Sequence, residues 1–511
     1  MNQIDRYTEI GALAEKVRNA IRKLIFPLSV FLVGVSAIFA FSEQAGAGAF
    51  ALICFSGCLA LAIWSSEAVG LPLLPIMIVQ SMIIYAVPIA AKHEVILNYP
   101  ADFVLNAGVE VMVFNLTMVA AWKFAMQVFR PSPPVSYALH EFNRSGIKGW
   151  ARLGFVLVGS ATTFQVLEGL NLTASLEALL PSGSSSILGA LVSVVSASGF
   201  FLVSMAVGGN GMSSGGRAAF WALLVINGMI SSSEFLLYTA AANLITVAIG
   251  FFWQSGRIPW RYLVISMAAL SFLNTGKTAM RERYWGSDEP PDSRTTIERL
   301  PSLYAEWISV SYDAILENKE TEIQRQNGSK DHIVGNQTLL DRIDNLQNLL
   351  FVIDAIKTEH VTPLYGATYT LIPPLLVPRI LWPDKPRSHA GQVLLNVHFG
   401  RQDLNSTFET YIAWGLLPEA YGNFGPILGA LVIGGFLGMS FAWIENLTAR
   451  KLVVSMEGFL SLCLLMNLMN SFEMVASVLV TATFQSFVIV VAACAPFVQR
   501  TVTPGAQPES A

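Results

Sequence analysis

The feature that most constrains this chain is the recurrence of long apolar stretches with almost no charge. A helix needs about 20 apolar residues to cross the hydrocarbon core of a bilayer. Hydrophobic residues make up 53% of the chain and charged residues 13%, whereas soluble domains carry about 25% charged residues. The sequence therefore predicts an all-α polytopic membrane protein. Twelve stretches are long and apolar enough, or nearly so, to span: Leu24–Phe41, Ala47–Trp64, Gly70–Ala91, Phe103–Trp122, Trp150–Leu167, Ile187–Gly208, Ala218–Ser231, Phe235–Trp253, Trp260–Asn274, Asn423–Ile444, Val453–Asn470 and Met474–Val498.

The distribution of arginine and lysine predicts the orientation, because cytoplasmic loops accumulate these residues. Lys16, Arg18, Arg22 and Lys23 lie just before the first stretch. With twelve spans, the short loops on the opposite side hold only Lys92. We therefore expect both termini in the cytoplasm. The predicted regions are a cytoplasmic N-terminus (1–23), a bundle of about nine helices (24–274), a large extracytoplasmic loop (275–422), about three further helices (423–498) and a cytoplasmic tail (499–511).

The large loop has its own helical patterns. Apolar residues recur at helical spacing over Thr295–Glu322 and Gln337–Lys357, which predicts two amphipathic helices. In the second, Asp344 and Asn345 are expected on the polar face. Such helices either pack on the bundle or lie in the membrane interface.

A further apolar segment, Pro363–Trp382, is long enough to resemble a span. It contains Pro373, Pro374 and Pro378, and each proline inside a helix costs about 3 kcal/mol. A crossing here would also invert the charge pattern of everything that follows. The segment is therefore predicted to be re-entrant or interfacial, a conformation that requires protein or water to satisfy its backbone.

The large loop concentrates basic residues that the other loops on its side avoid. Arginine matches pairs of phosphate oxygens and lysine supplies a compact charge, so this set suits a polyanion such as a pyrophosphate leaving group. For Lys277, Arg281 and Arg283 the alternative is that they reach lipid headgroups or pair with Glu282, Asp288 and Glu289. The residues are Lys277, Arg281, Arg283, Arg379, Lys385, Arg387, His389 and Arg401.

Carboxylates inside predicted spans are candidates for function, because an aspartate at a helix centre costs about 2.5–3.5 kcal/mol to insert. Glu110 is the clearest case. It is expected to act as a general base toward a sugar hydroxyl, to hydrogen-bond the sugar, or to make a helix-packing contact with a neighbouring Ser, Thr or Asn such as Asn106 or Asn115. Glu409 and Asp384 are alternative bases within the loop.

Several other kinds of site lack their usual parts. The sequence has no HExxH motif, no paired-aspartate DxD motif and no Walker loop. The four cysteines all lie in apolar stretches, where they suit packing rather than disulfides or metal. A net charge of −4 gives no indication of nucleic acid binding. We therefore expect no metal and no cofactor.

Four segments in the second half of the chain resemble one family. They are Gly276–Arg281 at the end of a predicted span, Thr362–Tyr369, Val377–Pro386, and Glu419–Gly425 before the next span. Their order and spacing over about residues 270–445 resemble those of the Wzy-type oligosaccharide repeat-unit polymerases, which include the O-antigen polymerases. The N-terminal spans resemble that family in hydropathy alone.

This resemblance implies a bacterial inner-membrane glycosyltransferase with a C-type glycosyltransferase fold. Such an enzyme transfers a growing glycan from undecaprenyl pyrophosphate to a lipid-linked repeat unit at the periplasmic face, without nucleotide or metal. The implied partners are undecaprenyl-pyrophosphate-linked oligosaccharides, membrane lipids, a chain-length regulator and a flippase. The resemblance assigns Arg379, Arg387 and Arg281 to the pyrophosphate, with Lys277 and Lys385 assisting, and Glu409 or Glu110 to the acceptor hydroxyl. Further substrate-binding candidates are Arg283, Tyr369, Trp382, Asp384 and His389.

Two other functions stay open at this stage. A lipid-linked glycan ligase would use the same chemistry on a different acceptor, and its loss would leave polymer on the undecaprenyl carrier. A glycolipid flippase or other secondary transporter also suits twelve spans with intramembrane carboxylates. Transporters typically bind substrate near the midplane between repeated halves, whereas the halves of this chain are dissimilar.

Overall fold

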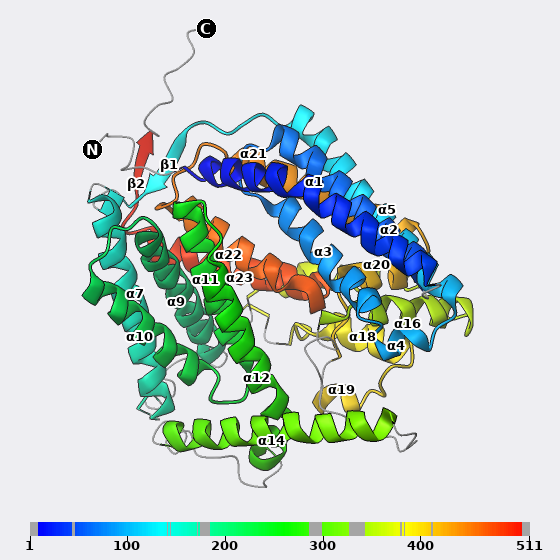
Figure 1. The fold of residues 1–511 in the computed structure, drawn as a ribbon. Helices are drawn as coiled ribbons and strands as arrows, with labels where there is room; N and C mark the ends of the chain where they lie inside the picture. Colours follow the sequence, from blue (N-terminus) through cyan, green and yellow to red (C-terminus); the bar gives the residue numbers. More distant parts are fainter. Residues whose placement is uncertain are drawn as a thin grey trace. The chain divides into compact units, whose positions relative to one another are not determined.

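The computed structural model is almost entirely helical, and its helices fall into two compact units (Figure 1). The first unit joins Met1–His140 to Ile343–Ala511, and the second is Glu141–Arg342. Each unit is described by itself. The structure describes residues 9–42, 46–139, 142–143, 145–170, 172–173, 184–285, 299–326, 343–378, 381–382, 384–409 and 412–502.

The long helices account for all twelve predicted apolar stretches. In the first unit they are α1 (Gly11–Phe41), α2 (Ala47–Glu67), α3 (Leu73–Ala90), α5 (Ala101–Val128), α21 (Leu428–Thr448), α22 (Met456–Met469) and α23 (Ala476–Cys494). In the second unit they are α7 (Gly146–Gly169), α9 (Ser184–Gly208), α10 (Ser214–Ser231), α11 (Leu237–Ser255), α12 (Trp260–Trp285) and α14 (Leu300–Gln326).

Eight of the described helices are long and apolar enough to cross a membrane: α1, α2, α3, α5, α9, α11, α21 and α23. The chain is an all-α polytopic membrane protein. The other four predicted stretches also form helices, namely α7, α10, α12 and α22. Twelve crossings therefore stay a prediction.

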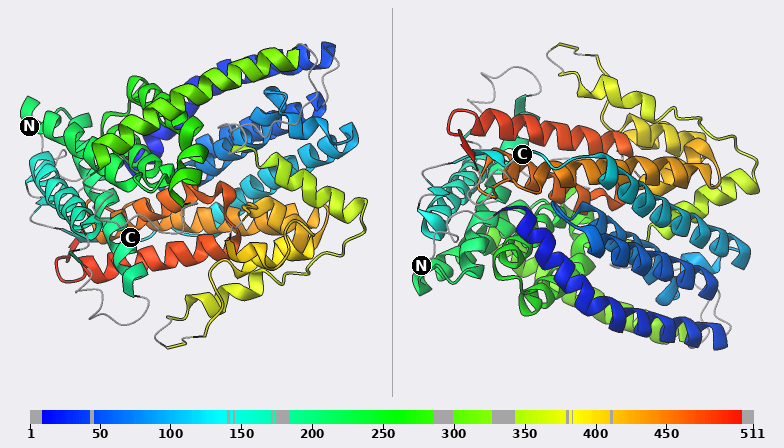
Figure 2. Two further views of the ribbon diagram at one scale, coloured as in Figure 1. Left: turned by 90° about the horizontal axis from the view of Figure 1, so that it is seen from below. Right: turned by 90° about the horizontal axis from the view of Figure 1, so that it is seen from above.

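Small residues bring the central helices of the first unit together. Helix α5 packs along both α21 and α2, and Figure 2 shows these helices running lengthwise beside one another. A Cβ added at Gly434 of α21 would lie 2.8 Å from the carbonyl oxygen of Phe114. At Gly108 of α5 it would lie 2.6 Å from the Cα of Ala49. Close approach of this kind is how membrane helices gain packing energy when lipid removes the hydrophobic driving force.

One end of the first unit, which we call the β end, carries a two-stranded antiparallel sheet of β1 (Val135–Ala138) and β2 (Gln499–Val502). The carboxylate of Glu445, in the last two turns of α21, is fully buried. It accepts hydrogen bonds from the indole N–H groups of Trp64 and Trp122 at 3.1 and 2.8 Å. It also accepts the backbone N–H groups of Val69 and Gly70. Four donors compensate the loss of water around this carboxylate.

The opposite end of the first unit, which we call the loop end, is built from short elements (Figure 1). They are α4 (Glu94–Leu97), α16 (Leu346–Lys357), η2 (Tyr369–Leu371), α17 (Ile372–Leu376), α18 (Ala390–His398), α19 (Ser406–Glu409), α20 (Leu416–Phe424) and η3 (Ser471–Glu473). The proline-rich segment Pro363–Trp382 forms only η2 and α17 among its described residues. The predicted loop of 275–422 is divided between the two units, because the second unit ends at Arg342.

Helix α16 confirms the apolar face predicted from the sequence, since Leu346, Leu350 and Ile353 are fully buried. The assignment of Asp344 and Asn345 to the polar face is wrong, because only 3% and 2% of their surfaces are exposed. The Asp344 carboxylate caps α16 by accepting from the N–H of Gln347 and also pairs with His93. The predicted start of this helix, 337–342, lies outside the described residues.

The second unit contains two apolar clusters and one polar cluster. Phe200 and Phe220 pack between α9 and α10, and Trp307 packs on Met280 and Phe235 around α12 and α14. The polar cluster joins three helices by amide groups: Asn227 of α10 donates to Gln165 of α7 at 2.7 Å and accepts from Asn243 of α11 at 2.7 Å. Helix α14 overlaps the first predicted amphipathic stretch: Leu303 and Trp307 are buried and Ser302 is exposed, although Ile308 and Tyr312 are exposed as well.

Candidate functional site

Two of the family-like segments, Thr362–Tyr369 and Glu419–Gly425, are hydrogen-bonded to each other at the loop end. The backbone N–H of Tyr365 donates to the carbonyl of Asn423 at 2.7 Å, and that of Leu364 donates to the carbonyl of Gly422 at 3.0 Å. The second segment forms α20, which begins after Gly415 at φ 97°. Two segments whose bonded residues are 58 positions apart in the sequence are therefore held together by backbone hydrogen bonds.

Glu419 lies at the centre of this junction, and none of its surface is exposed. The hydroxyl of Thr368 donates to its Oε1 at 2.7 Å, and the backbone N–H of Ala476 donates to its Oε2 at 2.6 Å. Burial raises the pKa of Glu419 to about 7, and these two hydrogen bonds act in the opposite direction. The carboxyl group therefore gains or loses its proton as the pH passes through neutrality, whereas an exposed glutamate does so near pH 4.5.

Asn423 and Tyr369 complete the junction. The Asn423 side-chain amide donates to the Thr368 hydroxyl at 2.9 Å and to the Glu419 carbonyl at 2.8 Å. The ring of Tyr369 stacks on Phe424 with centroids 5.6 Å apart. The Tyr369 hydroxyl is enclosed without a hydrogen-bond partner, and burial together with the Glu419 charge raises the Tyr369 pKa. Tyr369, a predicted substrate-binding residue, thus lies beside Glu419.

Glu110 is also at the loop end of the first unit, on the N-terminal half of α5. Its surface is 3% exposed, and its Oε1 accepts the backbone N–H of Ile427 at 2.8 Å. Its Oε2 is enclosed without a hydrogen-bond partner. Lys357 interacts electrostatically with Glu110, and the Glu110 charge adds to burial in raising the Tyr421 pKa. The predicted contacts with Asn106 and Asn115 are not formed: Asn115 donates instead to Ser56.

The third segment, Val377–Pro386, has a structural lysine. The Lys385 ammonium group donates to the carbonyls of Leu375 at 2.8 Å and Val377 at 2.6 Å. These carbonyls belong to the end of α17, where helices leave acceptors unsatisfied. Lys385 therefore folds this segment back on α17, while Asp384 and Arg387 are exposed.

Other predicted residues of this region are distributed as follows. His389 places its Nδ1 2.6 Å from the side-chain oxygen of Gln392. Trp382 is 42% exposed beside the more exposed Leu381. Glu409 is the last residue of α19, and its side chain lies outside the described part of the chain. Arg379 also lies outside the described residues.

Lys277, Arg281 and Arg283 belong to the second unit, on the last turns of α12. Lys277 is 4% exposed. Arg281 donates from Nη2 to the carbonyl of Phe235 at 2.9 Å, and Arg283 forms an ion pair with Glu306 at 3.0 Å. Arg283 is thus paired with a carboxylate, but the partner is Glu306 of α14 and not Glu282, Asp288 or Glu289, and the last two lie outside the described residues.

The fold and these sites can be compared with those of known proteins. No family model, curated protein or solved structure matches this chain.

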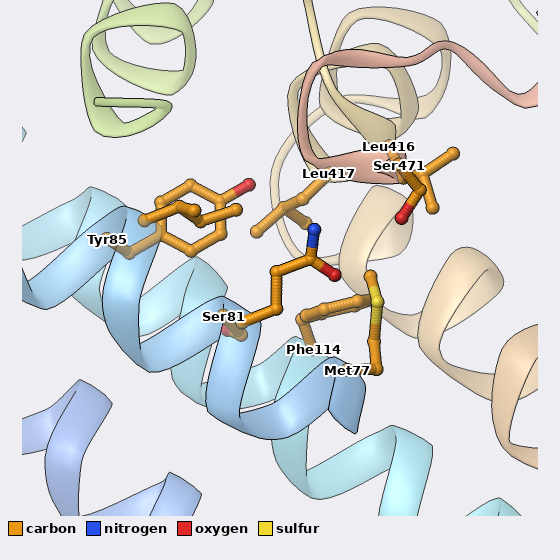
Figure 3. A pocket seen from close by; sticks show the side chains of 9 residues that line it. Met77, Ser81, Tyr85, Phe114, Leu416, Leu417 and Ser471 are labelled. Carbon is orange, nitrogen blue, oxygen red and sulfur yellow. The ribbon is translucent and has the colours of Figure 1, made fainter. Parts of the chain in front are cut away.

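A small cavity opens where α3, α5, α20 and η3 meet in the first unit (Figure 3). Figure 3 shows Tyr85, Leu416 and Leu417 around it. The Ser81 hydroxyl is buried without a hydrogen-bond partner. The remaining lining residues carry no charge and are mostly apolar: Met77, Gln80, Ile84, Phe114 and Ser471.

The sequence contained Glu419 within a family-like segment, but the residue was not among the predicted site residues. The sequence signal that could have identified it is that Glu419 is the one charged residue in the run Leu416–Gly425. Thr368 and Asn423 gave no signal of their own. Among the described residues, no group of three or more His, Cys, Asp and Glu residues is placed to hold a metal ion. The loop end therefore offers acid–base chemistry and basic side chains.

Proposed function

We propose that the protein is an inner-membrane polysaccharide polymerase that transfers a growing glycan from undecaprenyl pyrophosphate to a lipid-linked repeat unit. The observation that carries the proposal is the junction of Thr362–Tyr369 with Glu419–Gly425. Segments that resemble the polymerases in sequence are in direct contact around a buried carboxyl group. A polytopic helical protein that holds carboxyl groups and basic side chains at its loop end suits chemistry on a substrate anchored in the same membrane.

The proposed reaction needs one base and one set of cations. The acceptor sugar hydroxyl attacks the anomeric carbon of the donor, the bond from that carbon to the pyrophosphate oxygen breaks, and undecaprenyl pyrophosphate leaves. Glu110 is the proposed proton acceptor, because its Oε2 has no hydrogen-bond partner among the described residues; this oxygen is enclosed in the structure, so the proposal requires the substrate to open access to it. General base catalysis of this kind contributes about 10²–10⁴-fold in rate. Exposed Arg387 is proposed to stabilise the leaving pyrophosphate.

Glu419 has a different proposed role. Both of its oxygens accept hydrogen bonds from within the first unit, so it is not free to reach a substrate. We assign it to positioning the segment that carries Tyr369. In this proposal the loop end faces the periplasm, as the distribution of lysine and arginine predicts.

The test is transfer by the purified full-length protein in nanodiscs, supplied with undecaprenyl-pyrophosphate repeat units from its own pathway and no nucleotide. We expect a ladder of products on a gel. Glu110→Gln is expected to lower the rate about 10²–10⁴-fold, while Glu67→Gln, which changes a half-exposed carboxylate at the β end, leaves it unchanged. A folded wild-type protein that gives no ladder with authentic substrate refutes the proposal, and transfer to a different acceptor would identify a ligase.

A further inference from the structure

Arg401 is a partly buried arginine at the loop end with an unusual environment. Its guanidinium carbon lies 5.2 Å from the ring centre of Phe351 and 5.8 Å from that of Trp414. Its Nη1 atom is enclosed and has no hydrogen-bond partner. The described residues include no carboxylate in an ion pair with it.

The backbone fixes this arginine in place. The N–H of Arg401 donates to the carbonyl of Asn396 at 2.8 Å, just beyond the end of α18. The Asn396 side chain in turn accepts the indole N–H of Trp414 at 2.6 Å, and both Asn396 and Trp414 are fully buried. The arginine and the two rings it contacts are therefore held in position before any ligand arrives.

The electrostatic surroundings of Arg401 do not balance its charge. Tyr99 is the titratable group that interacts with it, and Asp354 of α16 acts on Tyr99. Burial lowers the pKa of the Arg401 guanidinium to about 10, with Tyr99 acting in the opposite direction, so the side chain is charged at neutral pH. Removing such a group from water is costly unless a partner compensates it.

We infer that Arg401 binds a two-oxygen anionic group, a phosphate or a carboxylate, on the glycan substrate, an inference that rests on the proposed polymerase function for the identity of that substrate. A planar guanidinium stacked on aromatic rings presents its remaining N–H groups as a fork that matches such a group. Two sources supply this chemistry: the pyrophosphate of the lipid carrier and the carboxylate of an acidic sugar.

The binding test uses the purified full-length protein in a nonionic maltoside detergent. Isothermal titration calorimetry at constant ionic strength measures the affinity for sodium pyrophosphate and, separately, for sodium glucuronate, with methyl glucoside as the neutral control. We expect one of the two anions to bind and methyl glucoside not to bind. The anion that binds identifies the source. If neither anion binds to the wild-type protein, the inference is wrong.

Three variants separate binding from structure. Arg401→Met keeps an unbranched side chain against Phe351 and Trp414 and is expected to weaken binding about ten- to a hundredfold, with an unfolding temperature equal to or above that of the wild type. Arg401→Lys keeps the charge but loses the planar fork, and is also expected to bind more weakly. Lys123→Gln, a half-exposed lysine near the β end, is the matched control and is expected to bind normally.

Equal affinity in the wild type and in Arg401→Lys overturns the inference, and this comparison holds even if Arg401→Met fails to fold. A lower unfolding temperature of ligand-free Arg401→Met would also overturn it, since a structural role would then explain the arginine. The transfer assay keeps the two proposals apart. Normal anion binding without a product ladder refutes the polymerase, whereas a normal ladder from Arg401→Met refutes the role of Arg401.

Discussion

The hydroxyl of Thr368 donates to the Oε1 atom of Glu419 across 2.7 Å, although the two residues are 51 positions apart. The same hydroxyl accepts from Asn423, so one side chain joins the proline-rich segment to both ends of α20. Both Thr368 and Glu419 are fully buried. A buried hydrogen bond contributes about 0.5–1.5 kcal/mol between neutral groups and about 1.5–3 kcal/mol when one group is charged, so this contact stabilises the loop end in either protonation state of Glu419.

Thr368→Val is therefore expected to destabilise the protein. Valine has nearly the shape of threonine, but it leaves Glu419 without one donor and Asn423 without one acceptor. We expect a loss of about 1–3 kcal/mol in the free energy of unfolding, measured by denaturant unfolding in detergent. Thr370→Val is the matched control, because the Thr370 hydroxyl is exposed and bonds only to the nearby carbonyl of Ala367. Equal stability of the two variants would contradict the stabilising role of this contact.

The second prediction concerns the dependence of stability on pH. Burial raises the folded-state pKa of Glu419 from its ordinary value of 4.5 to about 7. Between these values the unfolded chain has lost the proton while the folded protein keeps it. The contribution of Glu419 to stability is therefore full below pH 4.5 and is lost as the pH rises to about 7, where the loss levels off, at a cost on the order of 3 kcal/mol.

Glu419→Gln provides the measurement. The amide does not titrate, so the difference in unfolding temperature between the variant and the wild type should change across this pH window and be constant outside it. The difference isolates Glu419 from the other titrating groups, which both proteins share. A difference that is independent of pH from 4 to 8 would show that Glu419 ionises normally.

The third prediction concerns the β end. Glu445 accepts two indole N–H groups on Oε2 and two backbone N–H groups on Oε1. In Glu445→Gln, one side of the group becomes an NH₂ donor that faces two other donors. We expect a loss of about 2–4 kcal/mol, since a buried donor left unsatisfied costs about 1–3 kcal/mol. Thermal unfolding followed by tryptophan fluorescence measures it.

A matched control for Glu445 lies on α2. Glu67 is 40% exposed and pairs with Lys123 at 3.3 Å, and surface pairs of this kind contribute about 0–1 kcal/mol. Glu67→Gln is therefore expected to change the unfolding temperature little. If the two glutamine variants behave alike, the four donors do not stabilise the Glu445 carboxylate.

Hydropathy identified the helices because apolar length is a local property of the chain. Each of the twelve predicted stretches overlaps a long helix, although Asn423–Ile444 begins in α20 and crosses the break before α21. The prolines of Pro363–Trp382 correctly ruled out a long helix among the described residues of that segment. The buried face of α16 also followed from spacing alone. In each case the residues that decide the structure are neighbours in the sequence.

The polar residues of the loop end could not be predicted in this way. Asp344 can be buried because its carboxylate has a partner: the ring nitrogen of His93, 251 positions away in the sequence, lies 2.6 Å from it. Glu419 can be buried because Thr368 and Ala476, which come from other elements, donate hydrogen bonds to its carboxyl group. Conversely, Lys385 was predicted to bind substrate, yet its ammonium group bonds to two backbone carbonyls. A polar side chain gives no indication in the sequence of whether its partner is the protein or a ligand.

The last prediction concerns the contact of α12 with α14 in the second unit. A Cβ added at Gly276 would lie 2.6 Å from the Ser311 hydroxyl oxygen and 2.8 Å from the Ser311 backbone nitrogen. The helices cannot separate freely, because the Trp307 indole N–H donates to the carbonyl of Leu273 at 2.8 Å and the Thr275 hydroxyl donates to the carbonyl of Ser311. Gly276→Ala is therefore expected to cost about 1–3 kcal/mol in the free energy of unfolding.

Gly228→Ala is the control for this substitution, because a Cβ at Gly228 of α10 would meet no atom within 4 Å. There the loss of backbone entropy in the unfolded chain dominates, and alanine is expected to stabilise by about 0.5–1 kcal/mol. Denaturant unfolding of both variants measures two effects of opposite sign from the same chemical change. A stabilising effect at both positions would mean that α12 and α14 do not pack as closely as the Gly276–Ser311 contact requires.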